Sequence, residues 1–424
     1  MKRKLLSLSL SSSLLAGALM GGSMAAAATN DSDSITRGEF IKTIVDQLQF
    51  PLYDSSITLP KDVKSESPYA NAIRIMQERK VIYGFGDGTV RLENTLHKNE
   101  AYTIIARILG IDAEKAPEIL AKDYGVVLEN EVLSEDEARK AIEQALTSDP
   151  VAHEWVVKSS EEMEKQDSFK AVMQQNMNMS FNEKIPENNN QDSMTFSMNI
   201  EMAYKKDKGF HMVSTSKLPQ TLPNGGAEMN IEQYLVPEGM FMKMVNPETN
   251  EEEWINMGNQ MPFTFDQLME MQKESVSYNQ QMNNKYVFYR DLGSETVDGK
   301  TLHKVAYQGR FASMQEMMNI TKDLISTPEM QQSLMAGPGM DNISMSGIMW
   351  IDETTKLPVK MTVSMNMDLQ PSAEQPIKGM NMEMSGTYQD YNKVEDIVLP
   401  EAAKQAKTLE LPSAEDVEAY KVTE

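Results

Sequence analysis

Hydrophobic and polar residues follow two different patterns along this chain, and the change falls near Asp149 and Pro150. Before this point, apolar residues recur every three or four positions, as on one face of an amphipathic helix. After it, apolar and polar residues alternate one by one, which is typical of strands with a single buried face. The pattern therefore predicts a helical region followed by an antiparallel β region.

Methionine fills many of the apolar positions in the β region. The apolar residues are the even-numbered ones in 194–204 and 380–384 and the odd-numbered ones in 359–369. We expect helices at 151–168, 263–275 and 313–326 and hairpin turns at 297–300 and 352–358. This order of elements predicts a long antiparallel meander with inserted helices.

Three helices of the first region begin with a similar motif. A residue that can cap the helix is followed three positions later by glutamate, which is the pattern of a capping box. The pairs are Thr36 with Glu39, His97 with Glu100 and Ser134 with Glu137. The first and third pairs fit the pattern fully, and the His97 pair fits it in part.

The residues between the first two helix starts add a more specific pattern. They contain an Asp-Val pair at 62–63, a helix start at 68–73 and the turn Gly-Phe-Gly-Asp-Gly-Thr at 84–89. This order resembles the S-layer homology (SLH) module. The resemblance extends over about 31–148, and only the second copy, about 59–110, carries every part. SLH modules hold secreted proteins to anionic cell-wall polymers of Gram-positive-type envelopes, so the resemblance implies a wall-anchoring region.

The SLH resemblance also implies which residues contact the polymer. The arginine of the family motif maps onto Arg37 and, conservatively, onto Lys98, whereas the third copy has Glu135, which would repel an anion. We therefore expect one or two working sites. An arginine at a helix N-terminus can bind an anion even on an acidic protein. The expected polymer-binding residues are Thr36, Arg37, Glu39, Gly86, Asp87, Lys98 and Glu100.

The region from about 151 to 400 is similar to the LolA/LppX-type fold of bacterial envelope lipid carriers. The similarity rests on the order of the expected elements and on the hairpin that joins Trp350 and Asp352 to the Leu-Pro-Val-Lys run at 357–360. It implies a curved antiparallel sheet that forms an unclosed half-barrel, with helices on its concave side and a cavity for a lipid or another hydrophobic ligand. The expected cavity residues are Met198, Met202, Met361, Met365 and Met382.

Methionine also allows a second interpretation. Of the 35 methionines, 31 lie between Met163 and Met384. Thioether sulfur is a soft ligand that suits Cu(I), so a copper-binding protein is an alternative, with Met240, Met242 and Met244 as its ligands. Methionine is equally an adaptable packing residue for an apolar face. We favour packing or a pocket because methionine replaces Leu and Val at ordinary core positions.

Composition excludes several other classes of protein. The chain has 424 residues, 63 acidic and 40 basic side chains, a formal charge of −23 and no cysteine. Without cysteine there can be no disulfide, thiolate metal site, cysteine nucleophile or diacylglyceryl-cysteine anchor. The negative charge argues against nucleic-acid binding. The four histidines lack metal-ligand spacing, and no catalytic motif or cofactor motif occurs, so we expect no enzyme activity and no cofactor.

The N-terminal residues predict export. Lys2, Arg3 and Lys4 precede an apolar stretch that ends in small residues, as in a cleaved signal peptide at 1–28. We therefore expect an anchoring region at 29–150, the β domain at 151–400 and an acidic tail at 401–424, with no transmembrane segment after cleavage. The sequence predicts a secreted, wall-anchored binding protein, with a copper-binding protein or a structural S-layer component as alternatives.

Overall fold

The computed structural model describes residues 34–185, 191–217, 228–245, 251–257, 265, 269, 282–321, 339–370 and 377–408. The described residues from Ser34 on belong to one compact unit. The expected signal peptide, most of the expected helix at 263–275 and the chain from residue 409 on lie outside the described residues.

Five helices occupy the described residues before Asp149. They are α1 (Arg37–Leu48), α2 (Ala70–Glu78), α3 (Lys98–Leu109), α4 (Ala116–Tyr124) and α5 (Glu135–Leu146). All except α4 begin where the sequence pattern predicts a helix. The short α4 escaped prediction because it buries only two residues, Ala116 and Leu120, which is too few to show a helical period.

The capping motifs differ from expectation in one respect. The backbone N–H of His97 donates to the Glu100 carboxylate at 3.2 Å, so this pair makes the reciprocal bond of a capping box. The Ser134 hydroxyl accepts from the Glu137 N–H, but the Glu137 carboxylate turns away to the preceding loop, where it accepts from the N–H of Glu129 at 2.8 Å. The expectation that Ser134 and Glu137 form a full capping box is therefore wrong, because the loop offers free N–H donors.

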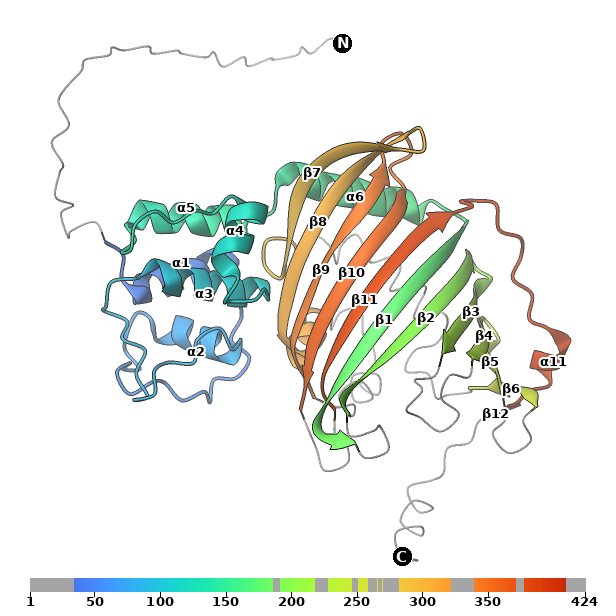
Figure 1. The fold of residues 1–424 in the computed structure, drawn as a ribbon, viewed down its shortest axis with the longest axis horizontal. Helices are drawn as coiled ribbons and strands as arrows, with labels where there is room; N and C mark the ends of the chain where they lie inside the picture. The colour runs from blue at the N-terminus through green and yellow to red at the C-terminus, as the bar shows by residue number, and fades with distance from the viewer. Residues whose placement is uncertain are drawn as a thin grey trace, which may run out of the picture. The chain divides into compact units, whose positions relative to one another are not determined.

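The remaining chain forms one 12-stranded sheet in the order β12-β6-β5-β4-β3-β2-β1-β11-β10-β9-β8-β7 (Figure 1). Every neighbouring pair is antiparallel except β12 with β6. The strands are β1 (Ser168–Ile185), β2 (Gln191–Lys205), β3 (Gly209–Lys217), β4 (Glu228–Val236), β5 (Gly239–Val245), β6 (Glu252–Asn256), β7 (Val287–Val297), β8 (Lys300–Ser313), β9 (Met340–Asp352), β10 (Pro358–Leu369), β11 (Ile377–Gln389) and β12 (Lys407–Thr408). Because β7 and β12 do not pair, the sheet is unclosed, and the expectation of a large antiparallel sheet with helices is confirmed.

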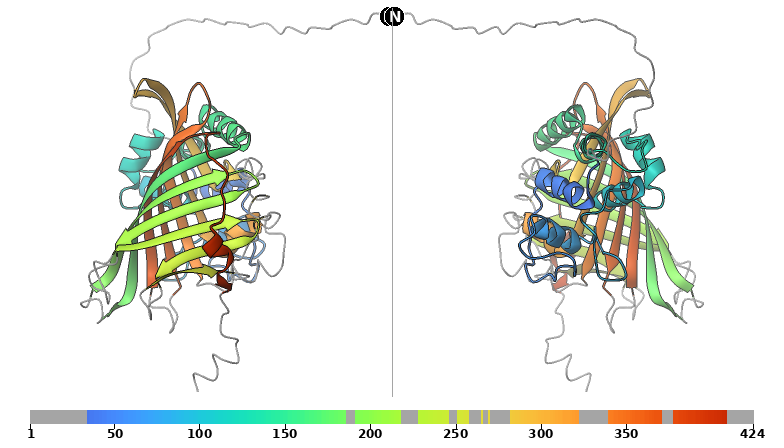
Figure 2. Two further views of the ribbon diagram at one scale, coloured as in Figure 1. Left: turned by 90° about the vertical axis from the view of Figure 1, so that its right-hand side faces the viewer. Right: turned by 90° about the vertical axis from the view of Figure 1, so that its left-hand side faces the viewer.

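Three helices accompany the sheet within the described residues: α6 (Pro150–Glu164), α9 (Met314–Thr321) and α11 (Glu401–Lys404). The strands curl toward the side on which α6 lies (Figure 2). Trp155 of α6 stacks on His303 of β8, with ring centroids 4.3 Å apart, so α6 covers one face of the sheet. Residues 401–408, assigned to an acidic tail by the sequence, form α11 and β12, and Ala403 is buried against Tyr234 and Phe241.

One hydrophobic core joins the helical region to the sheet. It extends from α1 and α3 to buried residues of β7, β8 and β9, including Val305, Phe311 and Ile351. A buried ion pair also crosses between the two, from Arg79 after α2 to Glu316 of α9. The helices before residue 150 therefore pack against the sheet through a shared core, in addition to their covalent connection to it.

Candidate functional site

Strand register gathers the methionines on one face of the sheet. In one row across four strands, Met177, Met382, Met365 and Met345 are direct neighbours. In the next row, Met194, Met179, Met380 and Met367 are direct neighbours. Adjacent strands lie about 4.8 Å apart, so these eight side chains form a continuous patch. We call the surface that carries these two rows the methionine face.

The methionine face is half-buried in the described structure. Its β9 and β10 methionines pack against the core, together with Met317 and Ile320 of α9. Most of its methionines keep intermediate exposure, which differs from the full burial of the helical core. A flexible thioether surface of this kind can adapt to apolar ligands of irregular shape.

The predicted cavity residues all lie on this face but not in one cluster. Met361, Met365 and Met382 occupy the central strands β10 and β11, and the Sδ of Met361 accepts a hydrogen bond from Tyr388 at 2.9 Å. Met202 packs at a separate aromatic cluster with Phe169 and others near the start of β1. Met198 lies between these two places on β2, and all five side chains are half-buried.

The alternative copper ligands, Met240, Met242 and Met244, alternate along β5 and so point to one side of this strand. Register places them on the methionine face, with Met242 opposite Gln233 of β4 and Ile255 of β6. Within the described part of the chain, no group of three or more His, Asp or Glu side chains could hold a metal ion.

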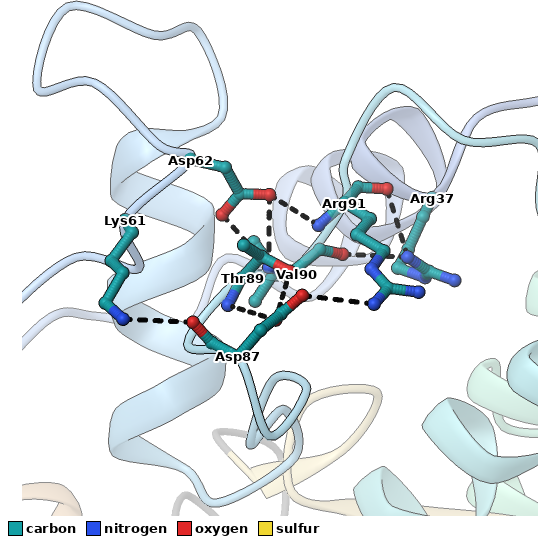
Figure 3. A network of polar contacts seen from close by, with 7 residues as sticks. All are labelled: Arg37, Lys61, Asp62, Asp87, Thr89, Val90 and Arg91. Carbon is teal, nitrogen blue, oxygen red and sulfur yellow. Dashed lines mark hydrogen bonds and ion pairs between the residues drawn. The ribbon is translucent and has the colours of Figure 1, made fainter.

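The predicted polymer-binding arginine has a defined set of partners inside the helical region (Figure 3). One terminal nitrogen of Arg37 donates to the backbone oxygens of Val90 at 2.8 Å and Arg91 at 3.0 Å. The other forms an ion pair with Glu100 at the start of α3. Arg37 is buried, and its first role is to hold the 84–91 loop against two helix starts.

Two aspartates organise the same loop (Figure 3). The Asp62 carboxylate accepts from the N–H groups of Val90 and Arg91, at 3.0 and 2.7 Å. The Asp87 carboxylate accepts from the hydroxyl and the N–H of Thr89, at 2.6 and 3.0 Å. These hydrogen bonds, with help from Arg91, lower the pKa of Asp87 to about 2. Asp87 and Asp62 are thus loop-forming residues here.

A groove of about 330 Å³ opens beside this loop. Its lining includes Arg37 and Glu100 from the prediction, together with Tyr83, Phe85 and Arg107. Tyr83 is 67% exposed, and the Arg107 guanidinium lies 4.9 Å from its ring centroid. We call this the aromatic groove.

The other predicted polymer-binding residues lie outside this lining. Thr36 and Glu39 cap α1, and their hydrogen bonds lower the pKa of Glu39. Lys98 forms an ion pair with Glu131 at 3.2 Å. Sequence reasoning did not assign Tyr83, Phe85 or Arg107 to the site. Tyr83 and Phe85 could have been assigned to the site from their positions on either side of Gly84. Both stand in a turn, where no buried helix face requires an apolar residue.

Comparison with family models gives one match. A family of unknown function, DUF6612, matches residues 151–408, which is more than half of the chain. The chain belongs to the DUF6612 family. The DUF6612 match spans α6, the whole sheet and α11, while α1 to α5 precede it. A comparison with curated proteins gave no match.

Several solved structures are similar to the DUF6612 part. LprF from Mycobacterium bovis is 12% identical and has a TM-score of 0.32, with 61% of this chain and 99% of LprF covered. The lipoprotein LppX from Mycobacterium tuberculosis is 12% identical, with a TM-score of 0.29 and coverage of 59% and 100%. A putative outer membrane lipoprotein-sorting protein domain from Vibrio parahaemolyticus is 10% identical, with a TM-score of 0.21 and coverage of 58% and 94%. These TM-scores are low.

None of the helices in the described part of this DUF6612 protein combines the length and apolar character that a bilayer crossing needs.

Proposed function

We propose that this protein is a non-enzymatic binding protein whose methionine face holds a lipid or another hydrophobic ligand. The observation that supports this most is the pair of cross-strand methionine rows on β2, β1, β11, β10 and β9, which is continuous but only half-buried. Burying a fully exposed apolar side chain of this size is worth about 1.5–3 kcal/mol, and each of these half-buried methionines would gain part of that on being covered. An acyl chain lying along several of these methionines would therefore bind favourably.

Binding of cis-parinaric acid, a fatty acid whose fluorescence rises in an apolar environment, tests this proposal. Met365 and Ser364 are adjacent residues of β10 that point to opposite faces of the sheet. We expect Met365→Gln combined with Met382→Gln to weaken binding about tenfold or more, because two apolar contacts are replaced by polar groups that must be desolvated. Ser364→Gln should leave binding unchanged. Equal binding by all three proteins would contradict the proposal.

Native mass spectrometry of the purified protein separates the alternatives for the methionine face. A co-purifying lipid supports the proposed function. Bound copper that is lost in Met240→Leu, Met242→Leu and Met244→Leu combined would support the copper alternative instead. If neither lipid nor copper is found and cis-parinaric acid does not respond, a structural role in the envelope is the remaining alternative.

For the helical region we propose a second function, attachment to an anionic cell-wall polymer through the aromatic groove. The supporting observation is that exposed Tyr83 and Phe85 line a groove together with Arg37 and Arg107. Exposed aromatic rings offer apolar faces to sugars, and the Arg107 guanidinium can attract an anionic substituent. The proposed location is the cell wall of a Gram-positive-type bacterium, with residues 1–28 as the export signal.

Sedimentation of the protein with isolated cell walls tests this attachment. Arg37→Ala would also release the 84–91 loop, so exposed groove residues give a cleaner test. We expect Tyr83→Ala and Arg107→Gln to reduce the sedimented fraction severalfold. Lys42→Gln serves as the control, because it changes an exposed charge in the middle of α1, outside the lining of the aromatic groove. Wild-type sedimentation of both groove variants would refute the assignment.

A further inference from the structure

A cavity that neither proposed function uses lies on the side of the sheet opposite to the methionine face. It measures about 860 Å³, within the roughly 300–1,000 Å³ range of typical ligand pockets. Its floor is the non-methionine face of β8 to β11 and β1, and its walls are α4 and the β7 residues that follow Phe288. We call it the polar-face cleft. It is separate from the methionine face and from the aromatic groove.

Strand register builds the floor of this cleft from hydroxyl, amide and carboxylate side chains. Two rows run across neighbouring strands: Asn176, Glu383, Ser364 and Ser346 in the first, and Gln174, Ser385 and Thr362 in the second. All seven line the cleft. At an interstrand spacing of about 4.8 Å they form a regular grid of hydrogen-bonding groups.

Several groups of this grid are available to a ligand. Within the described residues, the hydroxyls of Ser346, Ser364 and Ser385 and the carboxylate of Glu383 make no hydrogen bond or ion pair with the protein. Other members are already engaged. Asn176 accepts from Ser197 at 2.7 Å, and the Thr362 hydroxyl accepts from the Ile348 N–H at 3.2 Å. The cleft therefore presents free donors and acceptors on a fixed scaffold.

The charges around the cleft disfavour an anionic ligand. Arg290 contributes to the lining, but its two terminal nitrogens donate to four backbone oxygens, those of Thr147, Tyr289, Gln144 and Ala145 at 2.7 to 2.9 Å. Among the lining residues this leaves one ammonium group, on Lys122, against the carboxylates of Asp123 and Glu383, because the Asp291 carboxylate contacts His303 Nε2 at 3.0 Å. A polyanion would be repelled by this balance.

The walls add apolar surface to the polar floor. Ile111 and Ile119 of the helical region and Leu292 of β7 face the cleft. A ligand that matches both surfaces carries several hydroxyl groups and an apolar face, and it is not anionic. Sugar rings have this combination, because their hydroxyls lie around the edge and their C–H groups form the faces.

We propose that the polar-face cleft binds a neutral oligosaccharide, with Glu383, Ser364 and Ser346 as hydrogen-bonding partners. This activity goes beyond the proposed lipid site and differs from the proposed wall-polymer site in position and in ligand charge. It would give the protein a second carbohydrate contact between the helical region and the sheet.

Isothermal titration of the purified protein with chitotetraose, cellotetraose and maltotetraose tests the proposal. We expect at least one of these neutral tetrasaccharides to bind, and tetragalacturonate, an anionic tetrasaccharide, not to bind. Glu383→Gln should weaken the binding about tenfold and Ser364→Ala about fivefold, the losses expected for a hydrogen bond to a charged and to a neutral group. Both replaced side chains lack protein partners, so both variants should unfold at the wild-type temperature.

Glu201→Gln is the matched control. Glu201 belongs to β2 and lies on the same face of the sheet as Glu383, but it does not line the cleft. This variant should bind like the wild-type protein. The proposal is overturned if no neutral tetrasaccharide binds, if Glu383→Gln and Ser364→Ala bind normally, or if Glu201→Gln is weakened equally. Loss of binding in Tyr83→Ala alone would place the sugar in the aromatic groove and would also overturn it.

Discussion

Replacing Glu316 by Gln should lower the free energy of unfolding by about 3–5 kcal/mol, the cost of breaking a buried ion pair. The Arg79 and Glu316 side chains are only 2% and 5% exposed. Without the carboxylate, the Arg79 guanidinium would remain buried over the Phe50 ring, 3.7 Å from its centroid, with a backbone oxygen of Arg310 at 3.3 Å as its remaining polar partner. Glu316 also accepts from the N–H of Ala312 at 2.6 Å.

Urea unfolding followed by circular dichroism measures this change. Lys80→Gln is the matched control, because the Lys80–Asp341 pair also joins the helical region to the sheet but its lysine is 43% exposed. An exposed pair contributes about 0–1 kcal/mol, so this variant should be close to wild type. The double variant Arg79→Met with Glu316→Leu should recover much of the loss, since no unpaired charge stays buried. A loss below about 1 kcal/mol in Glu316→Gln would refute the reasoning.

Three further predictions concern the loops and helix ends. Gly88→Ala should destabilise the protein by about 1 kcal/mol in thermal unfolding because Gly88 has φ +83°, whereas Gly86→Ala, at an open position with ordinary φ, should have little effect. Asp87 stabilises the loop at pH values above its unfolded pKa of 3.8, and this contribution is lost as the pH falls through the folded pKa of about 2. The free energy of unfolding of Asp87→Asn should therefore fall less steeply than that of the wild-type protein as the pH is lowered between these two values. Arg290→Met should cost about 3 kcal/mol in urea unfolding, because four backbone oxygens at and beside the end of α5 lose their charged donor.

The alternating methionines of the β region allowed its antiparallel character to be predicted. In an antiparallel strand with one covered face, residue identity alternates with a period of two, and this period can be read directly from the chain. The helical starts of α1, α3 and α5 were equally readable, since capping residues act within one turn. The turns at 297–300 and 352–358 also lie where the sequence placed them, between β7 and β8 and between β9 and β10.

The candidate sites were less predictable because they depend on which strands become neighbours. Met177 and Met382 are far apart in sequence, and only the β1–β11 pairing makes them direct neighbours. The same holds for Ser346, Ser364 and Glu383. Their alternation along the strands predicts only a solvated face, and the tertiary structure places α4 beside it. Arg37 belongs to the SLH-like motif, but the spacing of the motif residues in the sequence does not predict its hydrogen bonds to the backbone of the 84–91 loop.

The sequence by itself therefore determined the helical and β regions, the caps of α1 and α3 and the apolar face of each strand, because these depend on contacts within a few residues. Tertiary structure decided the strand order, the packing of the helices onto the sheet through Arg79 and Glu316, and the polar-face cleft. The physical reason is that hydrophobic periodicity specifies which side of a strand is buried but not which strand lies beside it. The proposed ligand sites depend on that second choice.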